Sequence, residues 1–79
     1  MAKQFKTYKE ELVNEGRWAE LVKSLEYGIY EIALPNYSAL RAMLVTISRA
    51  NKNPDCKYKF STSTKYEPLI LRVEADLKK

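Results

Sequence analysis

Between residues 37 and 52, apolar side chains recur every three or four positions, which is the spacing of one buried face of an α-helix. At 100° per residue they fall within a sector of about 120°. The residues in this sector are Leu40, Met43, Leu44, Ile47 and Ala50. Asn36 or Ser38 can cap the N-terminus of the helix, and Asn53 followed by Pro54 stops it. We therefore predict a helix over residues 37–52.

The N-terminal part of the chain shows a less regular helical pattern over residues 7–26. Four apolar residues follow the spacing of a single buried stripe: Trp18, Leu21, Val22 and Leu25. Thr7 and Glu10 have the spacing of a capping box, in which each side chain accepts from the backbone N–H of the other residue. Gly16 interrupts the pattern, so residues 7–26 form either one helix or two helices that meet near Gly16.

Three further segments alternate between apolar and polar positions, as expected for strands with one buried face. In residues 29–34, the face better suited to the core holds Tyr30, Ile32 and Leu34. In residues 57–64, Tyr58, Phe60, Thr62 and Thr64 alternate with Lys57, Lys59, Ser61 and Ser63. Residues 69–75 alternate in the same way, and a connection of about four residues predicts an antiparallel hairpin over residues 57–75. Residues 76–79 are predicted to fray.

The order of these elements is α(α)–β–α–β–β, which predicts a single small α+β domain over residues 1–79. Its apolar faces are buried most simply by a three-stranded, mainly antiparallel sheet with the helices packed on one face. The C-terminal hairpin would then stand beside the helix at residues 37–52 in a wing-like arrangement. The strand at residues 57–64, or the one at 29–34, would lie at a sheet edge.

Composition favours an ordinary folded protein of a reducing compartment. The chain has 79 residues, of which 46% are hydrophobic and 30% charged, and it has one cysteine, Cys56. A small secreted domain normally carries an even set of cysteines. Residues 1–6 lack the apolar core of a signal peptide, and no apolar run approaches the roughly 20 residues that span a bilayer. We therefore expect a cytoplasmic location, or a nuclear one in a eukaryote, and no membrane partner.

The residue types that most enzymes need are missing. The chain has no histidine and only two glycines, Gly16 and Gly28. Histidine is the commonest general base and a frequent zinc ligand, and phosphate-binding loops need several glycines. We therefore predict no catalytic activity, no cofactor and no metal site. Glu31, which lies inside a strand, and Cys56 are the residues that would merit a test for catalysis.

The charge is concentrated in one part of the chain. Residues 36–66 hold six basic residues and one acid, Asp55, whereas the rest of the chain holds eight basic and nine acidic residues. The six basic residues are Arg41, Arg49, Lys52, Lys57, Lys59 and Lys65. A segment of one sign inside a folded domain is typical of a surface that meets an anionic partner.

Nucleic acid is the partner that this pattern favours, DNA above RNA. Lysine and arginine neutralise phosphates, and serine hydroxyls donate to them. The residues predicted to make these contacts are Arg41, Ser48, Arg49, Lys52, Lys57, Lys59 and Lys65. A helix followed by a basic hairpin is the general arrangement of winged DNA-binding domains. The match is incomplete, because residues 36–53 have room for one helix where such domains have two.

Two other interpretations remain open. The charges can serve solubility alone, as a solvated surface. Alternatively, the protein is an inhibitor or adaptor, of the kind that small virus- or phage-encoded regulators represent, which docks on a larger protein machine. The residues that favour a protein partner are Tyr37, Val45, Tyr66 and Ile70, because exposed aromatic and apolar side chains anchor interfaces. An exposed sheet edge could also pair with a second copy and form a homodimer.

Overall fold

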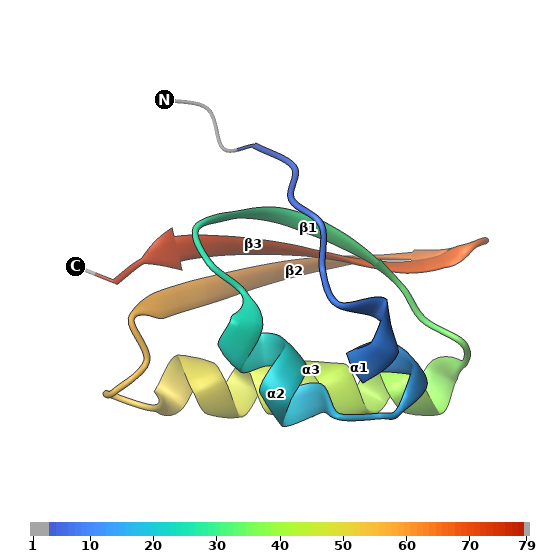
Figure 1. The fold of residues 1–79 in the computed structure, drawn as a ribbon, viewed down its shortest axis with the longest axis horizontal. Helices are drawn as coiled ribbons and strands as arrows, with labels where there is room; N and C mark the ends of the chain where they lie inside the picture. The colour runs from blue at the N-terminus through green and yellow to red at the C-terminus, as the bar shows by residue number, and fades with distance from the viewer. Residues whose placement is uncertain (1–3, 79) are drawn as a thin grey trace.

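The computed structural model describes residues 4–78, which form three helices on one face of a three-stranded antiparallel sheet (Figure 1). The elements are α1 (Glu10–Asn14), α2 (Trp18–Ser24), β1 (Gly28–Ala33), α3 (Tyr37–Lys52), β2 (Tyr58–Tyr66) and β3 (Leu69–Leu77). This arrangement confirms the predicted α+β class. Residues 1–3 of the segment inspected for a signal peptide, and Lys79 of the predicted tail, lie outside the described residues. Within residues 4–78, no helix has the length and apolar character needed to cross a bilayer.

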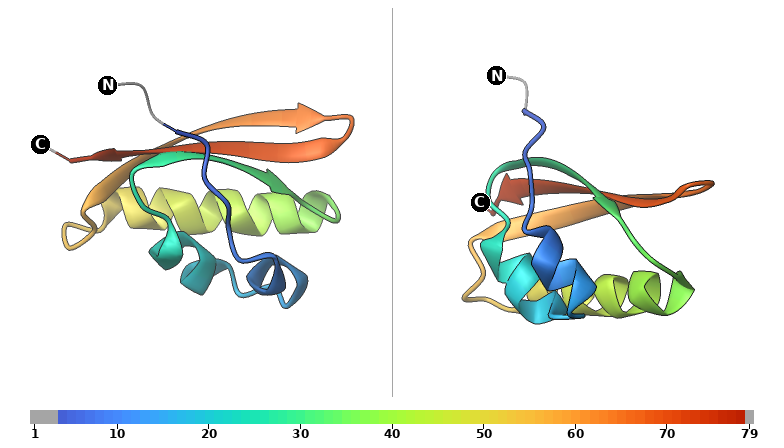
Figure 2. Two further views of the ribbon diagram at one scale, coloured as in Figure 1. Left: turned by 45° about the horizontal axis from the view of Figure 1, so that its top comes forward. Right: turned by 45° about the vertical axis from the view of Figure 1, so that its right-hand side comes forward.

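The sheet has the order β1-β3-β2, so β3 is its middle strand and pairs with both others. Tyr30 of β1 lies opposite Val73 of β3, and Phe60 of β2 lies opposite Ala75. Because side chains alternate between the two faces of a sheet, these four share one face. It is the buried face, and it is completed by Ile32 and Leu71. The two views in Figure 2 show that all three helices cover this face.

Helix α3 has the predicted bounds and the predicted buried face. The Asn36 side chain caps it by accepting from the backbone N–H of Ala39 at 2.9 Å. Leu40, Met43 and Ile47 are buried against the sheet, as their spacing predicted. The opposite side of α3 therefore faces solvent along the whole helix.

The N-terminal helical segment is two helices, and Gly16 explains the break between them. Gly16 has a φ of +67°, a conformation that glycine adopts without the steric cost of a Cβ atom. Its N–H donates to the C=O of Val13 at 3.1 Å, and the N–H of Arg17 donates to the C=O of Leu12 at 2.9 Å. These two bonds form the Schellman motif that ends a helix. Gly16 thus terminates α1 and lets the chain turn into α2.

The predicted capping box at Thr7 is wrong. Helix α1 begins at Glu10, after Lys9, and no side chain caps it. The reason lies in a pairing between distant residues. The N–H of Ile29 in β1 donates to Gln4 at 3.0 Å, and the N–H of Lys6 donates to Ile29 at 2.8 Å. The chain at Thr7 therefore still runs beside the sheet and reaches the helix layer only a few residues later.

The predicted fraying of the C-terminal tail is also wrong for its described part. Strand β3 continues to Leu77, and the backbone N–H of Lys78 donates to the C=O of Lys57 at 3.0 Å. The ammonium group of Lys78 donates to the backbone oxygens of Asn51 (3.3 Å) and Asn53 (2.9 Å). Since the last carbonyl groups of a helix lack partners within the helix, Lys78 stabilises the end of α3.

Asn51 joins the end of α3 to β2. Its side-chain nitrogen donates to the C=O of Phe60 at 2.9 Å, and its side-chain oxygen accepts from the N–H of Phe60 at 2.8 Å. The carboxamide thus occupies both outward backbone groups of Phe60, as a neighbouring strand would. This contact holds α3 in register with β2.

We expect Asn51→Ala to lower the stability of the fold by about 1–3 kcal/mol, because the variant loses two hydrogen bonds to partly buried groups. For a domain of this size, that corresponds to a fall in the melting temperature of roughly 4–24 °C. Thermal unfolding followed by circular dichroism measures it. Ser48→Ala, on the exposed side of the same helix, is the control and should change the stability by less than about 0.5 kcal/mol. Equal melting temperatures for the two variants would contradict the bridging role of Asn51.

Candidate functional site

The solvent side of α3 gathers four of the residues predicted to bind nucleic acid: Arg41, Ser48, Arg49 and Lys52. All four are exposed, and α3 contains no acidic residue. Within residues 4–78, the three cations of α3 form no ion pair. This side of the helix therefore keeps an unneutralised positive charge, with the exposed Val45 at its centre.

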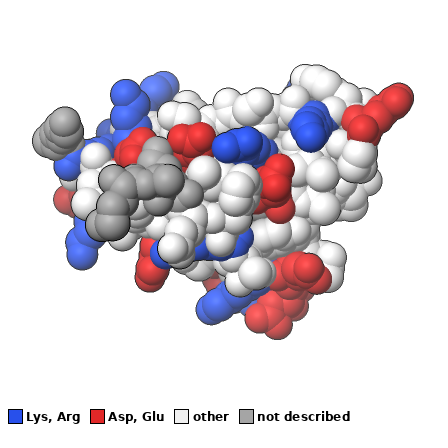
Figure 3. All heavy atoms as spheres, turned by 90° about the horizontal axis from the view of Figure 1, so that it is seen from above, with Lys and Arg blue, Asp and Glu red and all other residues white. Residues whose placement is uncertain are grey.

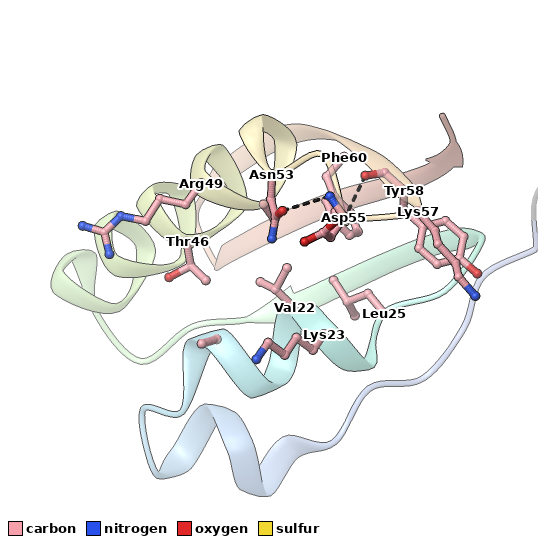
Figure 4. A pocket seen from close by; sticks show the side chains of 13 residues that line it. Val22, Lys23, Leu25, Thr46, Arg49, Asn53, Asp55, Lys57, Tyr58 and Phe60 are labelled. Atoms are coloured by element: carbon pink, nitrogen blue, oxygen red, sulfur yellow. Dashed lines mark hydrogen bonds between the residues drawn. The ribbon is translucent and has the colours of Figure 1, made fainter. Parts of the chain in front are cut away.

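Lys57 joins this group at the C-terminal end of α3, because Arg49 and Lys57 line the same pocket. The pocket has a volume of about 490 Å³ and lies between α2, the last turns of α3 and the start of β2 (Figure 4). Its apolar wall includes Val22, Leu25, Ala50 and Phe60. It is thus a hollow with apolar walls at one end of the basic helix face.

Lys23 and Asp55 line this pocket and were not anticipated as site residues. Lys23 belongs to α2 and lies outside the basic segment 36–66, and only the packing of α2 on α3 brings it near Arg49. The sequence feature that could have indicated this is the position of Lys23 directly after Leu21 and Val22, which are buried in α2. Tyr58 was expected on the buried face of its strand, where it is half-buried.

The structure does not bring Lys59 and Lys65 to the solvent side of α3. Both lie on the sheet face that points away from the helices, where Lys59 is opposite Asp76 and Lys65 is opposite Ile70. On the same face, Ser61 lies opposite Glu74. Figure 3 looks onto this face and shows Lys and Arg interspersed with Asp and Glu. Charges of both signs therefore offset each other there, and no single helix-plus-hairpin surface forms.

The alternation of side chains along β2 explains this separation. Phe60 points into the core and contacts the helix layer, so Lys59 and Ser61 must point to the other face. The predicted wing-like arrangement placed the helix at residues 37–52 beside the hairpin. In the structure, α3 instead packs on the buried face of the sheet to which the hairpin strands β2 and β3 belong. The alternation along β2 does not apply to Lys57, because Lys57 precedes β2 and lies in the loop that lines the pocket.

The residues that favour a protein partner are also divided. The rings of Tyr37 and Tyr66 lie 6.2 Å apart, and both side chains are more than half exposed, at 64% and 61%. Val45, which is 44% exposed, lies two turns after Tyr37 on α3. Ile70 lies on the opposite face of the sheet, beside Ala33 and Lys65. A compact aromatic pair therefore forms at one end of α3 without Ile70.

The two edges of the sheet differ in how they are covered. At β1, residues 4–6 bond to Ile29, and the hydroxyl of Tyr8 accepts from the N–H of Ala33 at 3.1 Å. At β2, Asn51 bonds to Phe60, and the thiol of Cys56 donates to the C=O of Tyr58 at 3.3 Å.

Further along β2, the outer edge is open. Backbone groups of an edge strand point alternately to the neighbouring strand and to solvent, so those of Thr62, Thr64 and Tyr66 point outward, as those of Phe60 do. They have no hydrogen-bond partner among residues 4–78.

Arg17, at the α1–α2 junction, is neutralised, unlike the cations of α3. The guanidinium of Arg17 donates to Glu20 and, at 3.1 Å, to Glu15. The hydrogen bonds to Glu20 and then to Glu15 raise the pKa of Arg17 above its ordinary value. This cluster at the α1–α2 junction therefore carries no excess positive charge.

The residues considered for catalysis are not assembled into a site. Glu31 is exposed on the edge strand β1, opposite Arg72 of β3. Cys56 is half-buried, and its thiol bonds to a backbone carbonyl. Within residues 4–78, no three potential ligands from histidine, cysteine, aspartate and glutamate come close enough to hold a metal ion.

Comparison of this chain with protein-family models, with curated proteins and with solved structures finds no match.

Proposed function

We propose that this protein is a small, non-catalytic regulatory module of the cytoplasm that binds nucleic acid through the solvent side of α3. The observation that carries the proposal is a set of three cations on α3, Arg41, Arg49 and Lys52, which form no ion pair among residues 4–78 and lie on a helix without acidic residues. Lys57, which follows α3 in the chain, and Lys23, on the neighbouring α2, add positive charge near Arg49. Lys59 and Lys65 are not part of the surface in this proposal.

The spacing of these cations suits a phosphate backbone. A rise of about 1.5 Å per residue separates Arg41 and Lys52 by roughly 16 Å along the helix axis. Phosphates of one DNA strand follow each other at about 3.4 Å along the duplex axis. The basic side of α3 therefore spans about five phosphates, and the hydroxyl of Ser48 can donate to one of them.

Salt dependence tests the proposal. Four or five phosphate contacts should give a slope of log K against log salt of about −3 to −4.5. Between about 50 and 200 mM salt, the affinity should then fall roughly 50- to 500-fold. Fluorescence anisotropy with labelled oligonucleotides of about 20 nucleotides, single-stranded and duplex, measures this. Absence of binding at about 50 mM salt, or binding that salt does not weaken, would refute the proposal.

A protein partner is the second candidate, and the open edge of β2 favours it. Thr62, Thr64 and Tyr66 present outward backbone groups, and the exposed pair of Tyr37 and Tyr66 lies at the end of this edge. An extended segment of a partner, or a second copy of the chain, could add a strand there. Such an interface depends on backbone hydrogen bonds and apolar contact, so salt would weaken it little. The salt titration therefore separates the two candidates.

A further inference from the structure

The pocket at the end of α3 has the size and walls of a small-ligand site. Its volume of about 490 Å³ lies within the range of about 300–1,000 Å³ that is typical of such sites. Phe60 and the half-buried Tyr58 contribute aromatic rings, and Val22 and Leu25 contribute aliphatic side chains. A flat apolar group can therefore lose its contact with water in this pocket.

Three cations from three different parts of the chain line this pocket. Lys23 comes from α2, Arg49 from α3 and Lys57 from the loop before β2 (Figure 4). None of them forms an ion pair within residues 4–78. The matching ligand thus has a flat apolar body and negative charge on more than one side of it.

Asp55 narrows the choice of ligand. It lines the same pocket, and its backbone N–H donates to the side-chain oxygen of Asn53 at 2.9 Å. Its carboxylate has no ion-pair partner among the described residues. A carboxylate repels an anionic head group but accepts hydrogen bonds from the amino group of a nucleobase. This favours a base with flanking phosphates over an aliphatic carboxylate.

We propose that the pocket takes one unstacked base of a single-stranded nucleic acid, while Arg49, Lys57 and Lys23 contact the phosphates on either side of it. The inference rests on the proposed function and specifies the form of nucleic acid that the protein binds. The strand runs from the solvent side of α3 into the pocket. In a duplex the bases are paired and stacked, so a duplex offers only its phosphates to this surface.

An abasic oligonucleotide tests the inference because it keeps every phosphate and lacks the bases. One base stacked in a protein pocket adds roughly 5- to 150-fold in affinity. In anisotropy titrations at equal length and salt, we therefore expect the mixed-sequence single strand to bind at least about fivefold more tightly than the abasic strand. We also expect it to bind more tightly than the duplex.

The outcomes separate this inference from the proposed function. Equal affinity for the mixed-sequence and abasic strands, or tighter binding of the duplex, would overturn the base pocket and leave the phosphate-binding surface of α3 standing. Absence of binding to all three probes would overturn both.

A variant that fills the pocket provides a second readout. Ala19 lines the pocket from α2 and is exposed, so a larger side chain there reaches the pocket without disturbing the core. We expect Ala19→Trp to reduce the ratio of mixed-strand to abasic affinity to about one, with the abasic affinity unchanged. Ala33→Trp, at an exposed position on the opposite sheet face, is the matched control and should keep the ratio. An unchanged ratio in Ala19→Trp would contradict the assignment.

Discussion

Leu71→Ala is expected to remove most of the stability of this protein. Leu71 is 0% exposed and lies in the middle strand, opposite Ile32 of β1 and Thr64 of β2. Truncation of a fully buried leucine costs about 2–5 kcal/mol, from lost burial and from the cavity that remains. A single core in a domain of this length rarely supplies more than about 3–5 kcal/mol. We therefore expect a large unfolded fraction at 25 °C, measured by urea denaturation with circular dichroism.

The same strand offers a matched control. Leu77 ends β3 and is 60% exposed, so Leu77→Ala removes the same atoms from a site that water already reaches. It should change the free energy of unfolding by less than about 0.5 kcal/mol. Similar free energies of unfolding for the two variants would contradict the claim that the buried side chain of Leu71 stabilises the fold.

The elements that the sequence predicted best are those with strong local patterns. Helix α3 has the predicted bounds, because its apolar spacing, its Asn36 cap and its stop at Asn53 act within a few residues of each other. The alternation in residues 29–34 and 57–75 likewise identified the buried faces of the strands. At Gly16 the sequence did not decide whether residues 7–26 form one helix or two. The Schellman motif that ends α1 depends on the positive φ of this one residue.

The errors concern contacts between residues that are far apart in the sequence. Residues 4–6 pair with Ile29, and Lys78 bonds to Asn51 and Asn53. Each of these contacts joins a terminal segment to a distant backbone group, and no local pattern in the sequence predicts such a contact.

The predicted nucleic-acid site was divided between two surfaces for a related reason. Residue alternation correctly grouped Lys59 with Ser61, but only the packing of α3 decides which face of the sheet the helix covers.

The final prediction concerns the three cations on the solvent side of α3. The triple variant Arg41→Gln, Arg49→Gln, Lys52→Gln should bind a single strand roughly 100-fold more weakly at about 50 mM salt, because each exposed charge contact contributes up to about 1 kcal/mol. The slope of log K against log salt should become shallower by about 2 to 3. Because these three side chains are exposed and form no ion pair with any described residue, the glutamines should leave the fold intact, which thermal unfolding verifies.

A charge-matched variant on the opposite sheet face decides between local contacts and overall charge. Both triple variants reduce the formal net charge of +4 by the same amount. The control replaces Lys59, Lys65 and Arg72 with glutamine. Its residues lie among Asp76, Glu74 and Glu31, so its affinity should fall by less than about threefold, through weaker long-range attraction alone. Equal losses in the two variants would mean that net charge, and not the side of α3, determines binding. A larger loss of affinity in the sheet-face control than in the α3 variant would mean that nucleic acid binds to the outer face of the sheet.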